Sequence, residues 1–193
     1  MPKIVDADDQ RTRIRSAARR VFAERGVRGT GLTHVAEAAS MSRSNLYHYY
    51  PDKPALLDAL VGEVLEQERE LFRDCLETAE APLERLERLA RACGGLFPEW
   101  AVFGRMFLDL RLEDAQVLKG LFHDLRHALA TVIAEGQRDG SLRTEPDAAI
   151  GASILMGAID GLLLQYFVDP DAFPDPERLA EALCETTRRI LAP

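Results

Sequence analysis

The sequence predicts an all-α protein in which a small N-terminal unit of three helices precedes a larger helical bundle, with about nine helices in all. Apolar residues recur at helical spacing along almost the whole chain of 193 residues, and the alternation typical of strands is nearly absent. Proline and glycine fall between the periodic segments. Residues 1–55 carry ten Lys and Arg against six Asp and Glu, whereas residues 56–193 carry fourteen against twenty-six. We therefore expect a basic N-terminal unit joined to an acidic body.

Composition places the chain among globular proteins. With 47% apolar and 29% charged residues it can bury a core, which excludes a disordered polypeptide. Three widely spaced cysteines indicate neither a disulfide framework nor a CxxC metal site. The N-terminal segment has no apolar core of a secretory signal, so we expect a cytoplasmic protein. The longest apolar run, residues 148–168, contains Asp160, and we expect a buried helix of a soluble protein here, without a membrane partner.

The first two helices are expected at residues 9–24 and 32–39. The first has apolar residues on one face and arginines on the other, the pattern of an amphipathic helix. Gly26 stands where a helix C-cap is expected. Either Thr30 or Gly31 is suited to cap the second helix.

The third helix is expected at residues 43–50, after a tight break. Ser42 can cap its N-terminus, and Pro51 ends it because the residue before a proline is pushed out of the helical region. Asp52 can cap the next helix, and Pro54 then lies in a first turn where its missing N–H does no harm. This order of helix, short helix, turn and short helix is the geometry of a helix-turn-helix.

The third helix carries an uncommon mixture of side chains. Leu46 and Tyr50 are four residues apart and form its inward stripe. Its other polar and aromatic residues face outward or sideways: Ser44, Asn45, Tyr47 and His48. A helix entering the major groove needs small residues, an Arg or Asn that bonds base edges, and hydroxyl or imidazole groups that reach phosphates. The alternative is that the rings only pack at a domain junction. The basic excess, the turn and Lys53 at the start of the following helix favour DNA reading.

A family resemblance is carried by the segment RIRSAARRVFAERGVRGTGLTHVAEAASMSRSNLYHYYPDKPALLDAL, above all by LYHYY followed by DKPALL. It resembles the N-terminal domain of the tetracycline-repressor (TetR) family of bacterial transcriptional regulators over about fifty residues. The connection EGQRDGSLRTEPDAA, residues 135–149, extends the resemblance weakly over the whole chain. The resemblance implies a helix-turn-helix domain over residues 1–53 and an effector-binding and dimerisation domain over residues 54–193.

The same resemblance places Thr33 beside the DNA backbone, opens the recognition helix at residues 42–45, and assigns Tyr47, Tyr49 and Lys53 to phosphate contacts. Together with the outward face of the third helix, it gives the expected DNA-contacting residues: Thr33, Ser42, Arg43, Ser44, Asn45, Tyr47, His48, Tyr49 and Lys53.

Two residues depart from the family pattern, which has glycine at both places. Ser40 must tolerate a turn conformation that glycine reaches more easily. Ser44, near the start of the recognition helix, is expected to affect base preference without disturbing the fold.

The body is expected to be helical throughout, with no repeat or low-complexity tract. Proline and glycine separate six expected helices: 54–78, 82–93, 99–110, 114–138, 146–168 and 176–191.

The run at 148–168 is apolar on nearly every face, and such a helix must be covered on every face. We expect it to form, with the last helix, a four-helix bundle between two identical chains, as a helix-turn-helix reader of palindromic DNA requires. The alternative is the central helix of a monomeric bundle. The candidate dimerisation residues are Gly157, Leu163, Leu164, Leu183 and Ile190.

A cluster of aromatic, sulfur-containing and polar residues in the middle of the body is a candidate effector cavity. Packing alone explains the cluster equally well, and for any single member a role in the core is favoured over ligand contact. Asp160, a candidate buried acid, is also explained by a bond to a neighbouring helix end. The candidate effector-binding residues are Trp100, Phe103, Met106, Phe107, Phe122, His123, His127, Met156 and Asp160.

His123 and His127 share a helical face at a spacing that suits a divalent metal, but the Glu of HExxH and a third ligand are missing from the sequence pattern. We therefore expect no metal. Motifs such as GxSxG and GxGxxG are absent from the sequence, so we also expect no cofactor and no catalysis. The sequence favours a dimeric repressor that a small hydrophobic effector releases from a palindromic operator. The alternatives are an effectorless architectural DNA-binding protein and a metal-dependent enzyme.

Overall fold

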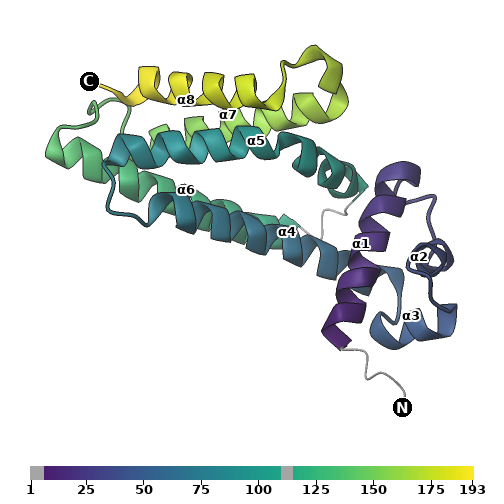
Figure 1. Cartoon of the computed structure of the whole chain (residues 1–193). Coiled ribbons are helices and arrows are strands. Elements are labelled where there is room, and N and C mark those ends of the chain that lie inside the picture. The colour runs from purple at the N-terminus through teal and green to yellow at the C-terminus, as the bar shows by residue number, and fades with distance from the viewer. Residues whose placement is uncertain (1–6, 110–114) are drawn as a thin grey trace. The chain divides into compact units, whose positions relative to one another are not determined.

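The computed structural model describes the backbone of residues 7–109 and 115–193, and their side chains apart from residues 99 and 101–118. Within these residues the chain is all-helical, with eight α-helices and one short 3-10 helix (Figure 1), close to the nine helices expected. The helices are α1 (Ala7–Arg25), α2 (Leu32–Ala38), α3 (Arg43–Tyr49), α4 (Lys53–Leu76), α5 (Pro82–Asp109), α6 (Ala115–Asp139), α7 (Ala148–Val168), η2 (Pro170–Ala172) and α8 (Pro176–Leu191).

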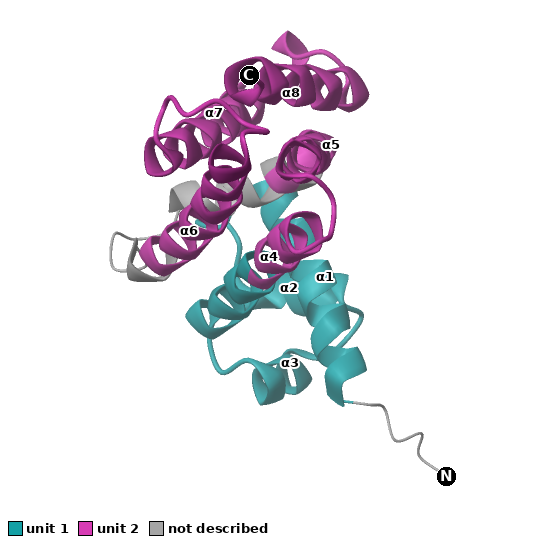
Figure 2. Ribbon diagram, turned by 90° about the vertical axis from the view of Figure 1, so that its left-hand side faces the viewer, with its two compact units in different colours: residues 1–65, 102–110 teal, residues 66–101, 111–193 magenta. Residues whose placement is uncertain are grey.

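The chain forms two compact units, coloured separately in Figure 2. Unit 1 comprises, among the described residues, 7–65 and 102–109, and unit 2 comprises 66–101 and 115–193. Unit 1 thus includes the first half of α4, because Leu56, Leu60 and Val64 are buried in its core. That core is otherwise built from α1, α2 and α3, through residues such as Ile14, Phe22, Val35, Leu46 and Tyr50.

The ends of the short helices follow the expected capping chemistry. Gly26 ends α1 at a φ of 73°, and Asp52 Oδ1 accepts the backbone N–H of Ala55 at 2.8 Å. The N-cap of α2 is Gly31, whereas the Thr30 hydroxyl donates to the carbonyl of Gly26 at 2.7 Å. Ser40 has a φ of 55°, so the left-handed turn conformation expected at this position is confirmed.

The two helices expected at 82–93 and 99–110 are one continuous helix, α5, with Pro98 inside it. A proline within a helix removes one backbone hydrogen bond and costs about 3 kcal/mol. Burial of Ala90, Cys93 and Phe97 on the preceding turns offsets this cost. The expectation of a break was therefore wrong because tertiary packing outweighs the local effect of proline.

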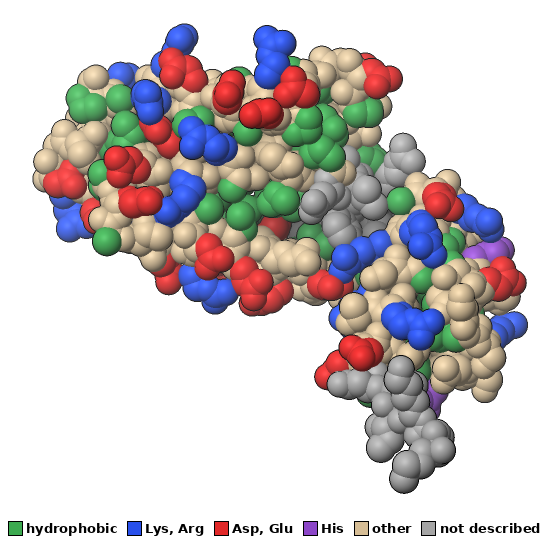
Figure 3. All heavy atoms as spheres, in the orientation of Figure 1, with side chains coloured by type: hydrophobic (Ala, Val, Ile, Leu, Met, Phe, Trp, Pro, Cys, Tyr) green, Lys and Arg blue, Asp and Glu red, His purple; other side chains and the backbone are tan. Residues whose placement is uncertain are grey.

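Unit 2 packs α5 against α8 and α6 against α7. Gly94 of α5 lies so close to α8 that a Cβ there would stand 2.6 Å from the Cα of Ala180. The carboxylate of Glu87 accepts two hydrogen bonds from Arg188, at 2.6 and 2.9 Å, and joins the same two helices. Basic and acidic side chains are interspersed over this unit on the face shown in Figure 3.

The helix α7 was expected to pack on its own bundle with one side only, and within one chain it is only partly buried. Its buried residues are Gly151, Ala152, Leu155 and Met156, and 22% of its apolar stretch is buried. Among the described residues, α7 is the one helix with the length and apolar composition of a membrane span. Large apolar side chains remain exposed on the rest of its surface, among them Ile150 and Val168.

Candidate functional site

The helix α3 is anchored on the core and presents a polar outer face. Leu46 is fully buried and Tyr50 is 6% exposed, as the expected inward stripe requires. The exposed residues are the expected outward set and the two before it: Ser42, Arg43, Ser44, Asn45, Tyr47 and His48. Two buried anchors therefore hold a seven-residue helix so that its first turn is open to solvent.

The N-terminus of α3 is capped from within. The Ser42 hydroxyl accepts the backbone N–H of Asn45 at 3.2 Å, so the expected cap is confirmed. This bond uses the backbone of Asn45 and leaves its side-chain amide exposed.

Arg43 and Tyr47 form a pair on the exposed face of α3. One guanidinium nitrogen, Nη2, donates to the Tyr47 hydroxyl at 3.2 Å, and the guanidinium carbon lies 5.3 Å from the centre of the ring. One turn of helix separates the two residues, which is the spacing at which side chains meet. The pair limits the rotamers that Arg43 can adopt.

Three further expected residues lie at the end of α3 or on the neighbouring helices. Thr33 is exposed on α2. Tyr49 is half-buried, its ring 5.5 Å from that of His48 and 5.9 Å from the Arg11 guanidinium. The ammonium of Lys53 donates to the carbonyl of Val27, which holds one of its three N–H groups inside unit 1.

Sequence reasoning missed a group of arginines on α1. Arg13 and Arg20 donate to the carbonyls of Ala39 and Ala38 at 3.2 Å, and so satisfy carbonyl groups at the C-terminal end of α2. Arg15 and Arg19 both contact the carboxylate of Glu63 on α4. In sequence these arginines are the charged face of an amphipathic helix, so their periodicity is that of a solvated surface and gives no signal of these bonds.

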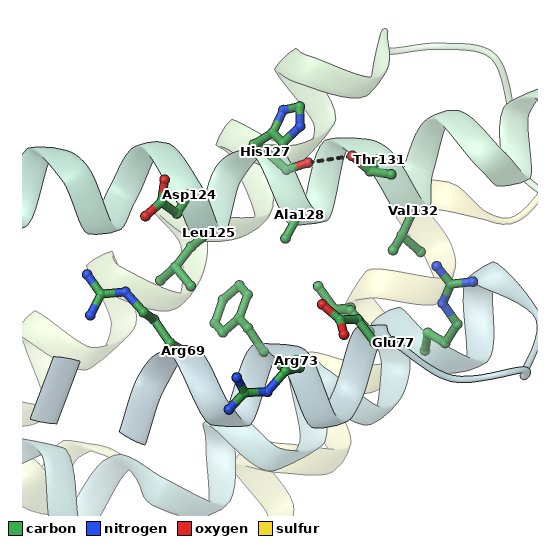
Figure 4. A pocket seen from close by; sticks show the side chains of 12 residues that line it. Arg69, Arg73, Glu77, Asp124, Leu125, His127, Ala128, Thr131 and Val132 are labelled. Carbon is green, nitrogen blue, oxygen red and sulfur yellow. Dashed lines mark hydrogen bonds between the residues drawn. The ribbon is translucent and has the colours of Figure 1, made fainter. Parts of the chain in front are cut away.

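The expected effector-binding residues do not form one site. His127 lines a groove of about 440 Å³ between α4 and α6, shown in Figure 4. Phe122 and His123 line a second hollow, of about 530 Å³, whose lining also includes Lys119 and Arg126.

The other expected effector residues lie elsewhere. Met156 is buried, and half-buried Trp100 packs against the core around Phe97 and Leu183. The side chains of Phe103, Met106 and Phe107 are outside the described part of the structure.

Two carboxyl groups of unit 2 have strongly shifted acidity. Burial raises the pKa of Glu68 from 4.5 to about 7, with a further contribution from the charge of Asp160. The pKa of Asp160 is raised from 3.8 to about 6, because surrounding protein atoms reduce its hydration, although the residue keeps contact with solvent. Arg126 acts in the opposite direction on Asp160. The two groups lie close enough to disfavour simultaneous ionisation.

The expected dimerisation residues fall on two kinds of surface. Gly157 and Leu164 are exposed on α7, and Leu163 is half-buried against the core. Leu183 is 7% exposed and, with Ile190, lines a small apolar cavity of about 30 Å³ inside unit 2. The outer face of α8 is charged, with Glu181, Glu185 and Arg189 exposed.

Over the described residues, no three His, Cys, Asp or Glu side chains come together in the manner of a metal site. His123 and His127 are both exposed on α6.

Comparisons with known proteins agree with this architecture. Residues 14–60 match the model of the bacterial regulatory proteins of the tetR family, and residues 111–192 match that of the C-terminal domain of BetI-type transcriptional repressors. The HTH-type transcriptional regulator TtgR of Pseudomonas putida is 26% identical over 179 residues, which cover 86% of this chain and 84% of that protein.

Solved structures of similar fold span nearly the whole chain. NalD, the secondary repressor of the MexAB-OprM multidrug efflux pump in Pseudomonas aeruginosa, is 25% identical, with a TM-score of 0.72 and coverage of 97% of this chain and 98% of its own. AibR, solved with isovaleryl coenzyme A and operator DNA, is 21% identical, with a TM-score of 0.73 and coverage of 92% and 97%. The likeness to AibR concerns the fold.

Proposed function

The chain belongs to the TetR family of bacterial regulatory proteins, and from this membership we propose that it is a dimeric transcriptional repressor that a small hydrophobic effector releases from a palindromic operator. It acts on double-stranded DNA in the cytoplasm, and catalysis has no part in the proposal.

The observation that carries the proposal is the exposed first turn of α3 above the buried Leu46 and Tyr50. Arg43 and Asn45 are the proposed base readers, because guanidinium and amide groups make bidentate bonds to base edges in the major groove. Ser42 and Ser44 allow the close approach that these bonds need. The proposed backbone-contacting residues are Thr33, Tyr47, His48, Tyr49 and Lys53.

A second copy of the chain is the proposed partner of α7. Four large apolar side chains are exposed on this helix: Ile150 (53%), Ile154 (45%), Leu164 (54%) and Val168 (73%). With Gly157 and Gly161 they form one continuous stripe along α7, because their spacing keeps them within a narrow arc of the helix. A Cβ at either glycine would meet nothing within 4 Å, so packing inside the chain does not explain these glycines. Burial of the stripe against its own copy gives a symmetric interface.

The two-fold symmetry of such a dimer matches a palindromic operator, whose half-sites each accept one α3 in the major groove. In this dimer, α7 is supported from inside unit 2 by Leu163, Leu183 and Ile190. The residues that contact the partner are Gly157 and Leu164.

Effector binding is proposed for unit 2, where the hollows lined by Phe122, His123 and His127 lie. The helix α4 contributes residues to both units, so a shift of its second half is carried along the same helix to its first half. An effector that prefers the conformation with low DNA affinity needs a coupling free energy of only about 1–3 kcal/mol. The relatives support this scheme, since NalD is a repressor and AibR was solved with both a ligand and operator DNA.

The proposal is tested by selection of duplexes from a random library with the purified full chain. We expect a palindromic consensus, bound with an affinity that falls steeply as salt concentration rises, because phosphate contacts release counterions. Failure to enrich any sequence at low ionic strength would contradict the proposal.

A further inference from the structure

The groove between α4 and α6 has the volume of a ligand site and an apolar floor. Its volume of about 440 Å³ falls within the range of about 300–1,000 Å³ that is typical of small-molecule sites. Four side chains that line it are less than a tenth exposed: Phe72 and Leu76 from α4, and Leu125 and Val132 from α6. The floor is therefore suited to an alkyl chain.

Cationic groups stand beside this floor on α4. Arg69 and Arg73 are one turn apart and extend from α4 at the groove (Figure 4). Their ion pairs, with Glu66 at 3.5 Å and Glu70 at 3.9 Å, are local pairs on an exposed helix surface. Pairs of this kind contribute little free energy, so both guanidinium groups can turn to an incoming anion.

A third arginine of the groove is buried. Arg85 of α5 is 8% exposed, and its Nη1 and Nη2 both donate to Glu135 at 3.0 Å. Its Nε is buried and has no hydrogen-bond acceptor among the described residues. A buried donor without a partner is costly, and within the described part of the chain this arginine is held in place by Glu135 alone.

Two carboxylates, Glu77 and Asp124, also line the groove. The Thr131 hydroxyl already donates to the carbonyl of His127 at 2.9 Å, so it is not the principal donor for a ligand. Of the charged side chains that line the groove, three are arginines and two are carboxylates. Arg85 is already neutralised by Glu135, whereas Arg69 and Arg73 have only exposed local partners, so these two are the groups available to an anionic ligand.

We propose that the groove between α4 and α6 binds a single-chain amphipathic anion, with its alkyl tail on the floor of Phe72, Leu125 and Val132 and its head group between Arg69 and Arg73. That this ligand is the effector rests on the function proposed above, whereas its binding is a property of the groove and is measured without DNA.

The test is calorimetric titration of the full chain with decanoate, below its micelle concentration, and with decyltrimethylammonium as the cation of equal tail length. We expect saturable binding of decanoate at one site per chain and weaker binding of the cation. The double variant R69Q/R73Q should weaken decanoate binding about tenfold, since two solvent-screened ion pairs with the carboxylate are lost. The variant Ala128→Phe should block it by filling the groove.

The matched control is R178Q/R189Q, which removes two exposed cations from α8 and should leave decanoate affinity unchanged. Circular dichroism checks that each variant is folded. Absence of decanoate binding, tighter binding of the cation, or an affinity that R69Q/R73Q does not change would overturn the proposal. Failure of the proposed function would be visible separately, as a chain that binds decanoate but no operator.

Discussion

The carboxylate of Glu63 on α4 accepts a hydrogen bond from Nε of Arg15 on α1 at 3.1 Å. The same carboxylate is paired with Arg19, and Arg15 also donates to the Tyr50 hydroxyl at 3.4 Å. Since Tyr50 anchors the end of α3, this cluster fastens α1 and α3 to the first half of α4. Under the proposed function, this cluster is a contact through which a change in α4 can reach α3.

Replacement of Glu63 by Gln should destabilise unit 1 by about 1–3 kcal/mol, because two half-buried guanidinium groups lose their counter-charge. Denaturant unfolding measures the change. The control is Glu185→Gln, which breaks the exposed pair of α8 with Arg189 and should cost less than about 1 kcal/mol. Equal effects of the two substitutions would mean that the Glu63 cluster carries no special stability.

Two adjacent glycines of α5 should respond to alanine in opposite ways. At Gly94 the added methyl group meets the backbone of Ala180, so Gly94→Ala should cost about 1–3 kcal/mol through overpacking. At Gly95 the same group meets nothing within 4 Å, and Gly95→Ala should stabilise the helix by about 0.5–1 kcal/mol. Urea unfolding of both variants is the measurement, and a Gly94→Ala variant as stable as the parent protein would contradict the close contact of α5 with α8.

The raised pKa of Glu68 predicts a pH-dependent stability. The folded chain keeps this proton up to about pH 7, whereas the unfolded chain loses it near 4.5. The contribution of Glu68 to stability is therefore complete below about pH 4.5 and declines as the pH rises to 7, where the poorly hydrated carboxylate forms.

Glu68→Gln should consequently gain stability over the parent protein as the pH rises from 4.5 to 8, on the order of 1 kcal/mol after allowance for solvent screening. Thermal unfolding at several pH values measures this difference. A difference that stays constant with pH would show that Glu68 is hydrated in the folded state.

The two kinds of proposed DNA contact should be separable by mutation. Tyr47→Ala and Lys53→Ala should weaken operator binding by a similar factor on all sequences, because phosphate contacts are not specific to sequence. Arg43→Ala and Asn45→Ala should instead change the preferred bases, at a cost of about 1–3 kcal/mol for the parental site. Fluorescence anisotropy and repeated selection distinguish these outcomes. If Asn45→Ala selects the same consensus DNA sequence as the parent protein, Asn45 does not contact the bases.

Local signals in the sequence were sufficient for much of unit 1. Ser42 and Asp52 cap the helices that they were expected to cap, and Ser40 adopts the left-handed conformation that its position demands. These features depend on a few neighbouring residues, so the sequence alone contains the information. The inward stripe of Leu46 and Tyr50 likewise follows from helical spacing.

Features that depend on distant residues were not predictable in the same way. Arg15 and Glu63 are 48 positions apart, and nothing in either helix marks them as partners. The break expected near Pro98 was wrong because contacts of α5 with α8, which no local pattern encodes, keep the helix continuous. The expected effector residues are divided between separate hollows, since helical periodicity gives the face of a residue but not the cavity that this face meets.

In the proposed complex, two copies of the chain are joined through the exposed stripe of α7, and each presents one α3 to a half-site. Sedimentation of the chain with its selected palindromic duplex measures this stoichiometry. We expect two chains per duplex, and binding to a duplex with one half-site that is weaker by at least about a hundredfold, since half of the base contacts are lost. A single chain per duplex, with equal affinity for the half-site, would contradict it.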